Sequence, residues 1–255
     1  MDLVSAVILG IVEGVTEFLP VSSTGHLILV QRALGIGAGG FASSFAIAIQ
    51  VGAILAVVSL YGRLLLRRPG LVLRLAAAFV PTAVIGAALY PFIKRLLDSP
   101  LVIVWALGLG GLALVVFEQA VAEPADAGED LARMPYRHAV LIGIAQSVAM
   151  IPGVSRAAAT VCGGLALGMS RRAIVEFSFL LALPTMAAAA GYDLIRSAPA
   201  FSGGEFGLLA LGFIVSWATA VAAIRWLLRF IQTHDFTWFG VYRMLIALVF
   251  AWLVL

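Results

Sequence analysis

Two short segments of this chain carry chemically active side chains inside otherwise apolar sequence. Residues 10–26 (GIVEGVTEFLPVSSTGH) contain two carboxylates, four hydroxyl groups and a histidine. Residues 143–160 (GIAQSVAMIPGVSRAAAT) contain an arginine shortly after a Pro-Gly pair. Ionisable side chains are costly at membrane depth and usually mark a functional site there. We therefore predict that the two segments meet and form one phosphate-handling site.

The two acids of the first segment are candidates for binding a metal ion. Glu13 and Glu17 are four residues apart, which places them on one face of a helix. Two carboxylates that close in a medium of low dielectric constant repel, so one must hold a proton or both must face a cation. A divalent cation with oxygen ligands, Mg²⁺ or Ca²⁺, would satisfy both. The alternative is that Glu17 lies at a hydrated helix end and that Glu13 hydrogen-bonds a neighbour.

Hydroxyl side chains and a histidine follow Pro20. Ser22 and Thr24 are expected to act as helix N-caps. Ser23 precedes His26 by three residues, a spacing at which a hydroxyl and an imidazole can approach. His26 could then activate Ser23 as a base or attack phosphorus itself. The alternative is a histidine held by hydrogen bonds in a structural role.

The sequence PGVSRAAAT in the second segment has the features of an anion site. Pro152 and Gly153 break the chain, so the next helix is expected to begin near Ser155. The N–H groups and the dipole at such an N-terminus attract anions. Arg156 adds a permanent cation, and Ser155 and Thr160 add hydroxyl donors. The alternative for Arg156 is a side chain that reaches out to lipid head groups.

The composition identifies the molecule that holds these segments as a membrane protein. Of its 255 residues, 63% are hydrophobic and 11% are charged, whereas a soluble domain is about one quarter charged. The basic residues lie mostly between apolar runs, which indicates topology signals and lipid contact, not nucleic-acid binding. The single cysteine, Cys162, excludes an intrachain disulfide. We expect an all-α polytopic membrane protein.

The apolar runs predict the elements that must position the site. Residues 2–30 are interrupted around Pro20 and residues 139–168 around Pro152, and each run predicts a re-entrant hairpin, because a piece much shorter than about 17 residues does not cross a bilayer. Irregular backbone at membrane depth is tolerated only inside protein or along a polar cavity. Six further apolar runs predict spanning helices, at residues 43–62, 73–92, 101–119, 174–196, 206–228 and 239–255.

The order of these elements repeats within the chain. A shift of 133 residues brings Gly10 onto Gly143 and superposes three spans on three spans. Each half is thus a re-entrant broken hairpin plus three transmembrane helices, and the odd number of spans predicts an inverted-topology repeat. We expect a single membrane domain, 1–255, with two halves and a polar linker, at residues 1–119, 139–255 and 120–138.

The basic residues also predict the orientation. One side of the predicted fold collects Arg63, Arg67, Arg68, Arg133, Arg137, Arg171, Arg172 and Arg229, and the other collects Arg32, Lys94, Arg95 and Arg196. Because positive residues concentrate in cytoplasmic loops, the first side is expected to be cytoplasmic. Both termini and the mouth of the first hairpin are then expected outside.

The motifs resemble those of the bacterial undecaprenyl-diphosphate phosphatase family of the bacitracin-resistance type. The acidic motif of that family, Glu/Gln-x-x-x-Glu, is matched by Glu13 and Glu17, and its serine and histidine by Ser23 and His26. Its arginine motif, Pro-Gly-x-Ser-Arg-Ser-x-x-Thr, is matched by Pro152, Gly153, Ser155, Arg156 and Thr160. Ala157 departs from the second serine of the motif, so that hydroxyl is not needed here. The likeness extends over nearly the whole chain, including residues 45–58 and 177–185.

This resemblance implies the reaction and its setting. The expected enzyme removes the terminal phosphate of a C55 polyprenyl diphosphate and returns the monophosphate carrier lipid to peptidoglycan synthesis, which confers bacitracin resistance. The resemblance also implies a bacterial plasma (inner) membrane location, a site open to the periplasmic side and dependence on a divalent cation. The expected partners are the lipid substrate and membrane lipids, and the oligomeric state stays open, with a homodimer included.

The resulting hypothesis gives each residue a role. Arg156, with Gly153, Ser155 and Thr160, holds the diphosphate. Glu13 and Glu17 hold Mg²⁺ or Ca²⁺, and either Ser23 or His26 attacks phosphorus or activates water.

Two further expectations concern the rest of the chain. Phe45, Phe177 and Phe179 are expected to line a groove for the prenyl tail. The rival hypothesis is a polyprenyl-phosphate flippase or secondary transporter, because inverted repeats with broken helices are typical of transporters.

Overall fold

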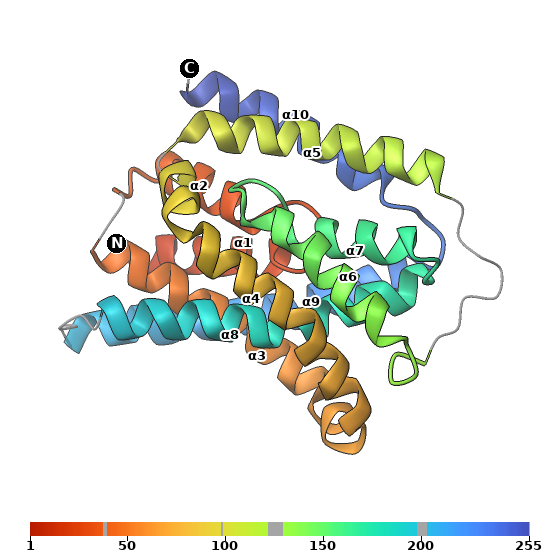
Figure 1. Cartoon of the computed structure of the whole chain (residues 1–255). Coiled ribbons are helices and arrows are strands. Elements are labelled where there is room, and N and C mark those ends of the chain that lie inside the picture. Colours follow the sequence, from red (N-terminus) through yellow and green to blue (C-terminus); the bar gives the residue numbers. More distant parts are fainter. Residues whose placement is uncertain (38–39, 98, 122–129, 198–202, 255) are drawn as a thin grey trace.

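The computed structural model describes residues 1–37, 40–97, 99–121, 130–197 and 203–254, and within these ranges the chain is entirely helical (Figure 1). Its elements, in chain order, are α1 (Leu3–Thr16), α2 (Ser23–Ala33), α3 (Phe41–Arg67), α4 (Pro69–Leu97), α5 (Pro100–Ala120), α6 (Tyr136–Ser147), the 3₁₀ turn η1 (Val148–Met150), α7 (Arg156–Ala166), α8 (Arg171–Ser197), α9 (Gly203–Phe230) and α10 (Thr237–Val254). The predicted all-α class is confirmed.

Both predicted interruptions are present. The first apolar segment forms helices of 14 and 11 residues, α1 and α2, and the second forms helices of 12 and 11 residues, α6 and α7. The breaks fall where proline, glycine and hydroxyl side chains interrupt the apolar pattern, because proline lacks the N–H that a continuing helix needs. Placement of these pairs as re-entrant hairpins in a bilayer stays a prediction.

The six predicted spans correspond to α3, α4, α5, α8, α9 and α10. Five helices of the described chain are long and apolar enough to cross a membrane, and α10 is apolar but shorter. Most of the helices run past the predicted ends, as α3 does to Arg67, because hydropathy marks only the apolar part of a helix. The polar linker separates α5 from α6, and residues 122–129 of it lie outside the described residues.

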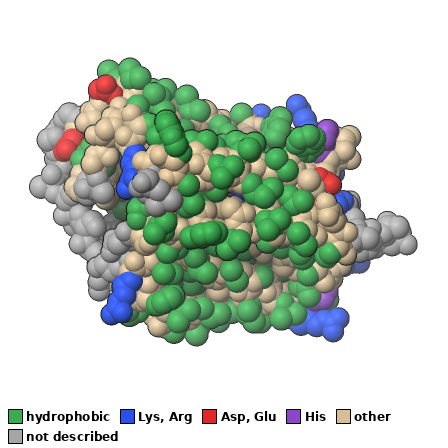
Figure 2. All heavy atoms as spheres, turned by 90° about the horizontal axis from the view of Figure 1, so that it is seen from above, with side chains coloured by type: hydrophobic (Ala, Val, Ile, Leu, Met, Phe, Trp, Pro, Cys, Tyr) green, Lys and Arg blue, Asp and Glu red, His purple; other side chains and the backbone are tan. Residues whose placement is uncertain are grey.

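The outer surface is apolar between its charged ends. Figure 2 shows hydrophobic side chains over the middle of one face, with arginine and lysine gathered toward its left and right ends. Large side chains such as Leu66, Trp105, Leu248 and Trp252 are more than half exposed. A soluble protein seldom exposes so much contiguous apolar surface. This surface and the long apolar helices identify a multi-pass membrane protein.

Packing around α9 fixes the first broken segment in the fold. Helices α1 and α3 both pack on α9, α4 packs on α6, and α5 pairs with α10 across the top of Figure 1. The main core lies between these layers and includes fully buried Phe18, Phe177 and Phe179. The short helices that carry the candidate site are therefore surrounded by long ones.

Two glycines let α1 approach α9 at backbone distance. A Cβ atom on Gly14 would overlap the carbonyl oxygen of Ser216, and one on Gly10 would lie 2.9 Å from that of Gly212. Small residues four apart allow this kind of close helix contact in membranes. Because Glu13 adjoins Gly14, this contact sets the depth and rotation of the acidic face of α1.

We expect Gly14→Ala to destabilise the fold. The added methyl group meets backbone that cannot move independently, and overpacking of this kind costs about 1–3 kcal/mol. The measurement is the thermal unfolding midpoint in detergent. Gly207→Ala in α9 is the matched control, because a Cβ atom there meets nothing within 4 Å. Equal midpoints for the two variants would contradict the close contact.

Candidate functional site

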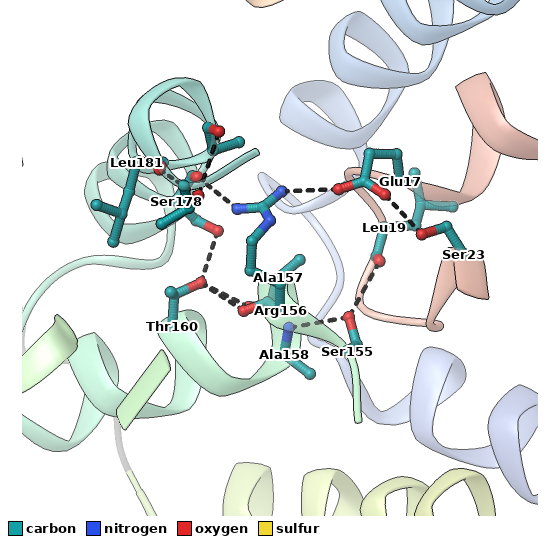
Figure 3. Close-up of polar contacts among 12 residues, drawn as sticks. Glu17, Leu19, Ser23, Ser155, Arg156, Ala157, Ala158, Thr160, Ser178 and Leu181 are labelled. Carbon is teal, nitrogen blue, oxygen red and sulfur yellow. Dashed lines mark hydrogen bonds and ion pairs between the residues drawn. The ribbon is translucent and has the colours of Figure 1, made fainter. Parts of the chain in front are cut away.

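The two broken segments meet through an ion pair. Arg156, the first residue of α7, directs Nη2 to Glu17 Oε1 at 3.5 Å. Its Nη1 donates to the carbonyl oxygen of Ser178 in α8 at 2.8 Å, so the guanidinium lies between α8 and the end of α1 (Figure 3). Residues 139 positions apart are thus joined. The prediction that the segments come together is confirmed.

Ser155 caps the start of α7 and also bonds the other segment. Its hydroxyl accepts a hydrogen bond from the N–H of Ala158 at 3.2 Å, which is an N-cap, and it donates to the carbonyl oxygen of Leu19 at 3.4 Å. The predicted helix start is therefore correct. The N-terminal end of α7, which favours anions, lies beside the first loop.

Glu17 links the Arg156 guanidinium to the Ser23 hydroxyl. It lies directly after α1, and its N–H bonds the carbonyl oxygen of Glu13 at 2.9 Å. Its Oε2 accepts a hydrogen bond from Ser23 Oγ at 2.5 Å, while its Oε1 faces Arg156. A carboxylate at a helix C-terminus is disfavoured by the dipole, and Arg156 and Ser23 offset that cost. Chemically, a carboxylate in this position can take the proton of a serine nucleophile.

His26 is held away from this chain of contacts. Its Nδ1 lies 2.8 Å from the carbonyl oxygen of Ser22, and its Nε2 lies 2.8 Å from the hydroxyl of Tyr242 in α10. The two rings are stacked with centroids 5.5 Å apart. Within the first turn of α2, Ser23 faces Glu17 while His26 faces α10. Ser23 thus has a carboxylate partner, and the roles of both residues in the reaction stay predictions.

The N-cap prediction is correct in position for Ser22 and wrong for Thr24. Ser22 occupies the N-cap position of α2, but its side chain makes no capping bond, and Thr24 already lies inside the helix. Ser22 has a φ of 73°, the one positive value among the described non-glycine residues. Such a backbone costs on the order of 1–3 kcal/mol and is found mainly at functional sites. The sharp turn that it makes brings Ser23 back toward Glu17.

Thr160 and Gly153 lie behind the site. The Thr160 side chain is fully buried, and its hydroxyl lies 2.6 Å from Ser178 Oγ and donates to the Arg156 carbonyl oxygen at 3.0 Å. Gly153 has a φ of 93°, and a Cβ atom there would lie 2.8 Å from the carbonyl oxygen of Ile103. Both residues therefore hold the backbone that carries Arg156. A phosphate contact for either one stays a prediction.

A cavity of about 900 Å³ opens beside the ion pair. Its lining includes the polar residues Glu17, Ser22, Ser23, Thr24, Gln50, Thr82, Gln146, Ser155, Arg156 and Thr185, and apolar residues of α4 and α8 such as Phe79, Ala83, Gly86, Met186 and Ala189. A polar head group and an apolar tail would both find matching surface here.

The predicted lining by three phenylalanines is wrong. Phe45, Phe177 and Phe179 are at most 1% exposed and are not among the residues around the cavity. Their side chains pack in the cores between helices, because aromatic bulk is used there for packing. Small residues of α4 and α8 leave the open space instead.

The acids at the site suit a cation that takes its remaining ligands from elsewhere. Glu13 is fully buried, and neither of its carboxylate oxygens has a hydrogen-bond partner in the described structure. Glu13 lies close enough to Glu17 and Arg156 to interact with their charges. No group of three or more histidine, cysteine or acidic side chains occurs among the described residues. Two carboxylates fit Mg²⁺, which commonly binds through one or two acids plus phosphate and water oxygens.

Sequence reasoning missed Arg243 and Tyr242, two polar residues of α10. Arg243 is 1% exposed and donates to the carbonyl oxygens of Pro20 and Gly153, one in each break. The available signal was an arginine inside an apolar span, which marks a functional position by default. Its partners are backbone carbonyls, and these leave no signature in a sequence.

Comparison with known proteins agrees with this arrangement. Residues 6–249 match the family model described as "Bacitracin resistance protein BacA". The chain is 49% identical to the undecaprenyl-diphosphatase of Aquifex aeolicus, with 96% of each chain covered. It is 48% identical to that of Thermus thermophilus, covering 98% of this chain and 97% of the relative. Because the family model matches residues 6–249, which include both segments that build the site, the chain belongs to the bacitracin resistance protein BacA family.

Proposed function

We propose that this protein is an integral-membrane phosphatase that hydrolyses undecaprenyl diphosphate to undecaprenyl phosphate and inorganic phosphate. The observation that carries the proposal is the contact chain from Arg156 through Glu17 to Ser23, three residues that line a largely apolar cavity. Relatives that bear the name undecaprenyl-diphosphatase match over nearly their whole length. The product would serve again as carrier lipid for peptidoglycan synthesis, and more enzyme would give bacitracin resistance.

The cavity suits a substrate with a charged head and a long apolar tail. Arg156 and the N-terminus of α7 would hold the diphosphate, since a guanidinium and free helix N–H groups both favour phosphate oxygens. The apolar faces of α4 and α8 would receive the first prenyl units. Because the cavity combines both surfaces, it favours a lipid phosphate over a small soluble one.

The geometry supports Ser23 as the nucleophile. Its hydroxyl lies 2.5 Å from Glu17 Oε2, so the carboxylate can accept the proton as oxygen attacks the terminal phosphorus. The bond from that phosphorus to the bridging oxygen then breaks, and Glu17 returns the proton to the departing lipid phosphate. Water then gives a proton to Glu17 and attacks the phosphoserine; the bond between phosphorus and the Ser23 oxygen breaks, inorganic phosphate leaves, and Glu17 returns the proton to Ser23. Throughout, Arg156 faces the charge that develops.

A divalent cation fits the same site as part of this proposal. Glu13 and Glu17 would hold it, and Glu13 has two buried oxygens that the described protein does not otherwise satisfy. When bound, the cation would neutralise phosphate charge and orient the diphosphate. Arg156 and the cation would then hold the substrate from two sides.

The proposal includes the inverted-topology repeat and its orientation. Exchange of α1–α5 with α6–α10 converts the packing of α1 on α9 into that of α6 on α4, and the packing of α3 on α9 into that of α8 on α4. Contacts between α3 and α8 and between α5 and α10 map onto themselves. Such a pattern supports two related halves. Both termini lie on the left of Figure 1, which is consistent with both lying outside and with a site that opens to the periplasm.

The direct test is release of inorganic phosphate from undecaprenyl diphosphate in detergent. We expect the protein to release phosphate and Arg156→Ala to lose about 10²–10³-fold in turnover, as for loss of one transition-state donor. Arg156→Lys should recover only part, because lysine cannot bridge Ser178 and Glu17 at once. Arg133→Ala is the control, since that side chain is 88% exposed at the surface.

A wild-type protein that releases no phosphate would overturn the proposal. The rival flippase would instead move a polyprenyl phosphate across proteoliposomes without hydrolysis. An active Arg156→Ala variant would overturn only the phosphate role of that arginine.

Trapping of a phosphoenzyme separates the two candidate nucleophiles. We expect label from the terminal ³²P of the substrate on Ser23, and a loss of turnover above about 10³-fold in Ser23→Ala. Ser59→Ala is the control, because that hydroxyl is exposed on α3 and bonds only Leu55 and Trp217. Label on His26 would contradict the assignment.

Removal of divalent cations should abolish turnover reversibly. We expect EDTA to stop phosphate release and Mg²⁺ to restore it, because two carboxylates and a diphosphate repel without a cation between them. Glu13→Gln should weaken Mn²⁺ binding measured by electron paramagnetic resonance in the absence of substrate. Unchanged Mn²⁺ binding in that variant would remove Glu13 from the proposed cation site.

A further inference from the structure

Arg243 is the largest fully buried side chain in the described structure, and the reaction outlined above does not use it. It lies on α10, far in sequence from both broken segments. A buried arginine is expensive in any protein and more so at membrane depth. Its presence there therefore calls for a specific role.

One guanidinium bonds three separate pieces of backbone. Nη1 donates to the carbonyl oxygen of Pro20 at 3.3 Å, and Nη2 donates to those of Gly153 at 3.1 Å and Ala106 at 3.0 Å. Pro20 belongs to the first break, Gly153 to the second and Ala106 to α5. Arg243 thus bonds both breaks at once from a third helix, α10.

Two of these carbonyl groups need such a donor. Those of Pro20 and Gly153 lie where the helices are interrupted, so regular helix hydrogen bonds do not satisfy them, whereas that of Ala106 lies within α5. An unsatisfied carbonyl costs several kcal/mol in lipid. In the described structure, the hydrogen bonds of Arg243 all go to carbonyl oxygens. Its two Nη atoms are therefore committed to the two breaks and to α5, while Nε has no partner among the described residues.

Helix α5 is shaped to admit the guanidinium. A Cβ atom on Gly110 would overlap Arg243 Nη2, and one on Gly111 would lie 3.0 Å from Arg243 Cβ. Any larger residue at position 110 would push the guanidinium away from the carbonyls. The bonding position of Arg243 thus depends on a glycine of a neighbouring helix.

The bonded carbonyls stand close in sequence to the site. Pro20 lies midway between Glu17 and Ser23, and Gly153 precedes Arg156 by three residues. We propose that Arg243 is a positioning residue that locks the two broken loops in register, and so sets Ser23 and Glu17 against Arg156. This role rests on the proposed function only for its effect on turnover, because the locking itself is a property of the loops.

The experiment compares Arg243→Met, Arg243→Lys and Gly110→Ala with Gly108→Ala. Gly110→Ala keeps the arginine and displaces it, whereas a Cβ atom on Gly108 makes only an ordinary contact of 3.5 Å with Ala247. The first readout is amide hydrogen exchange by mass spectrometry in detergent, over the loops at 17–23 and 151–155. We expect faster exchange in both loops together in Arg243→Met and Gly110→Ala, with Gly108→Ala like the wild type.

The second readout is the kinetics of phosphate release. We expect the turnover number to fall on the order of 10²-fold in Arg243→Met and Gly110→Ala, as for a small misplacement of reacting groups, with a much smaller change in KM because Arg156 remains. Arg243→Lys should be intermediate. The double variant should be no worse than either single one, since both remove the same bonds.

Each outcome contradicts one part of the proposal: the locking role, the positioning role or the proposed function. Wild-type exchange in both loops of Arg243→Met, or in one loop only, would overturn the locking role even if the protein proved inactive as a phosphatase. Faster exchange in both loops of an active protein with unchanged turnover would overturn the positioning role while leaving the proposed function intact. Failure of the wild type to release phosphate would overturn the function alone, because exchange still reports on the lock.

Discussion

Backbone left unsatisfied where helices break inside the protein is the constraint on which the rest of this structure depends. Two helices break inside the protein, and each break frees carbonyl and N–H groups that lipid cannot satisfy. In the structure, the two breaks pack against each other, and their backbone groups bond side chains. Ser155 caps α7 and bonds the carbonyl oxygen of Leu19, while Arg243 bonds a carbonyl oxygen in each break. The polar site is therefore a by-product of the same contacts that make the breaks tolerable.

The two halves contribute different chemistry to one place. The first brings Glu13, Glu17 and Ser23, and the second brings Arg156 on the N-terminus of α7. Gln146, in the second broken segment, donates a hydrogen bond to Thr82 in α4. Because acids and arginine come from different segments, neither broken segment alone can balance its charge. Folding of one segment thus requires the other.

Much of this arrangement could be predicted from the sequence. Hydropathy predicts the helices, and the Pro and Gly residues that interrupt the apolar runs predict the breaks. The cost of buried charge predicts that Glu17 and Arg156 meet. Side-chain direction within a single turn could not be predicted: Ser23 and His26 share the first turn of α2, yet they face α1 and α10. The three phenylalanines were misplaced for a similar reason, since hydrophobicity does not separate a core position from a cavity wall. Arg243 bonds only backbone carbonyl oxygens, and such contacts leave no pattern in the sequence.

The ion pair between Arg156 and Glu17 has a consequence for the exchange of substrate and product at the site. An anion that reaches Arg156 competes with Glu17 for the same guanidinium, whose Nη2 lies 3.5 Å from the carboxylate. A diphosphate carries more charge than a monophosphate and so competes better. Once a phosphoryl group has been removed, the carboxylate regains the advantage. In the proposed reaction, Glu17 would thereby stand in for the substrate head group at Arg156 and favour release of the product lipid.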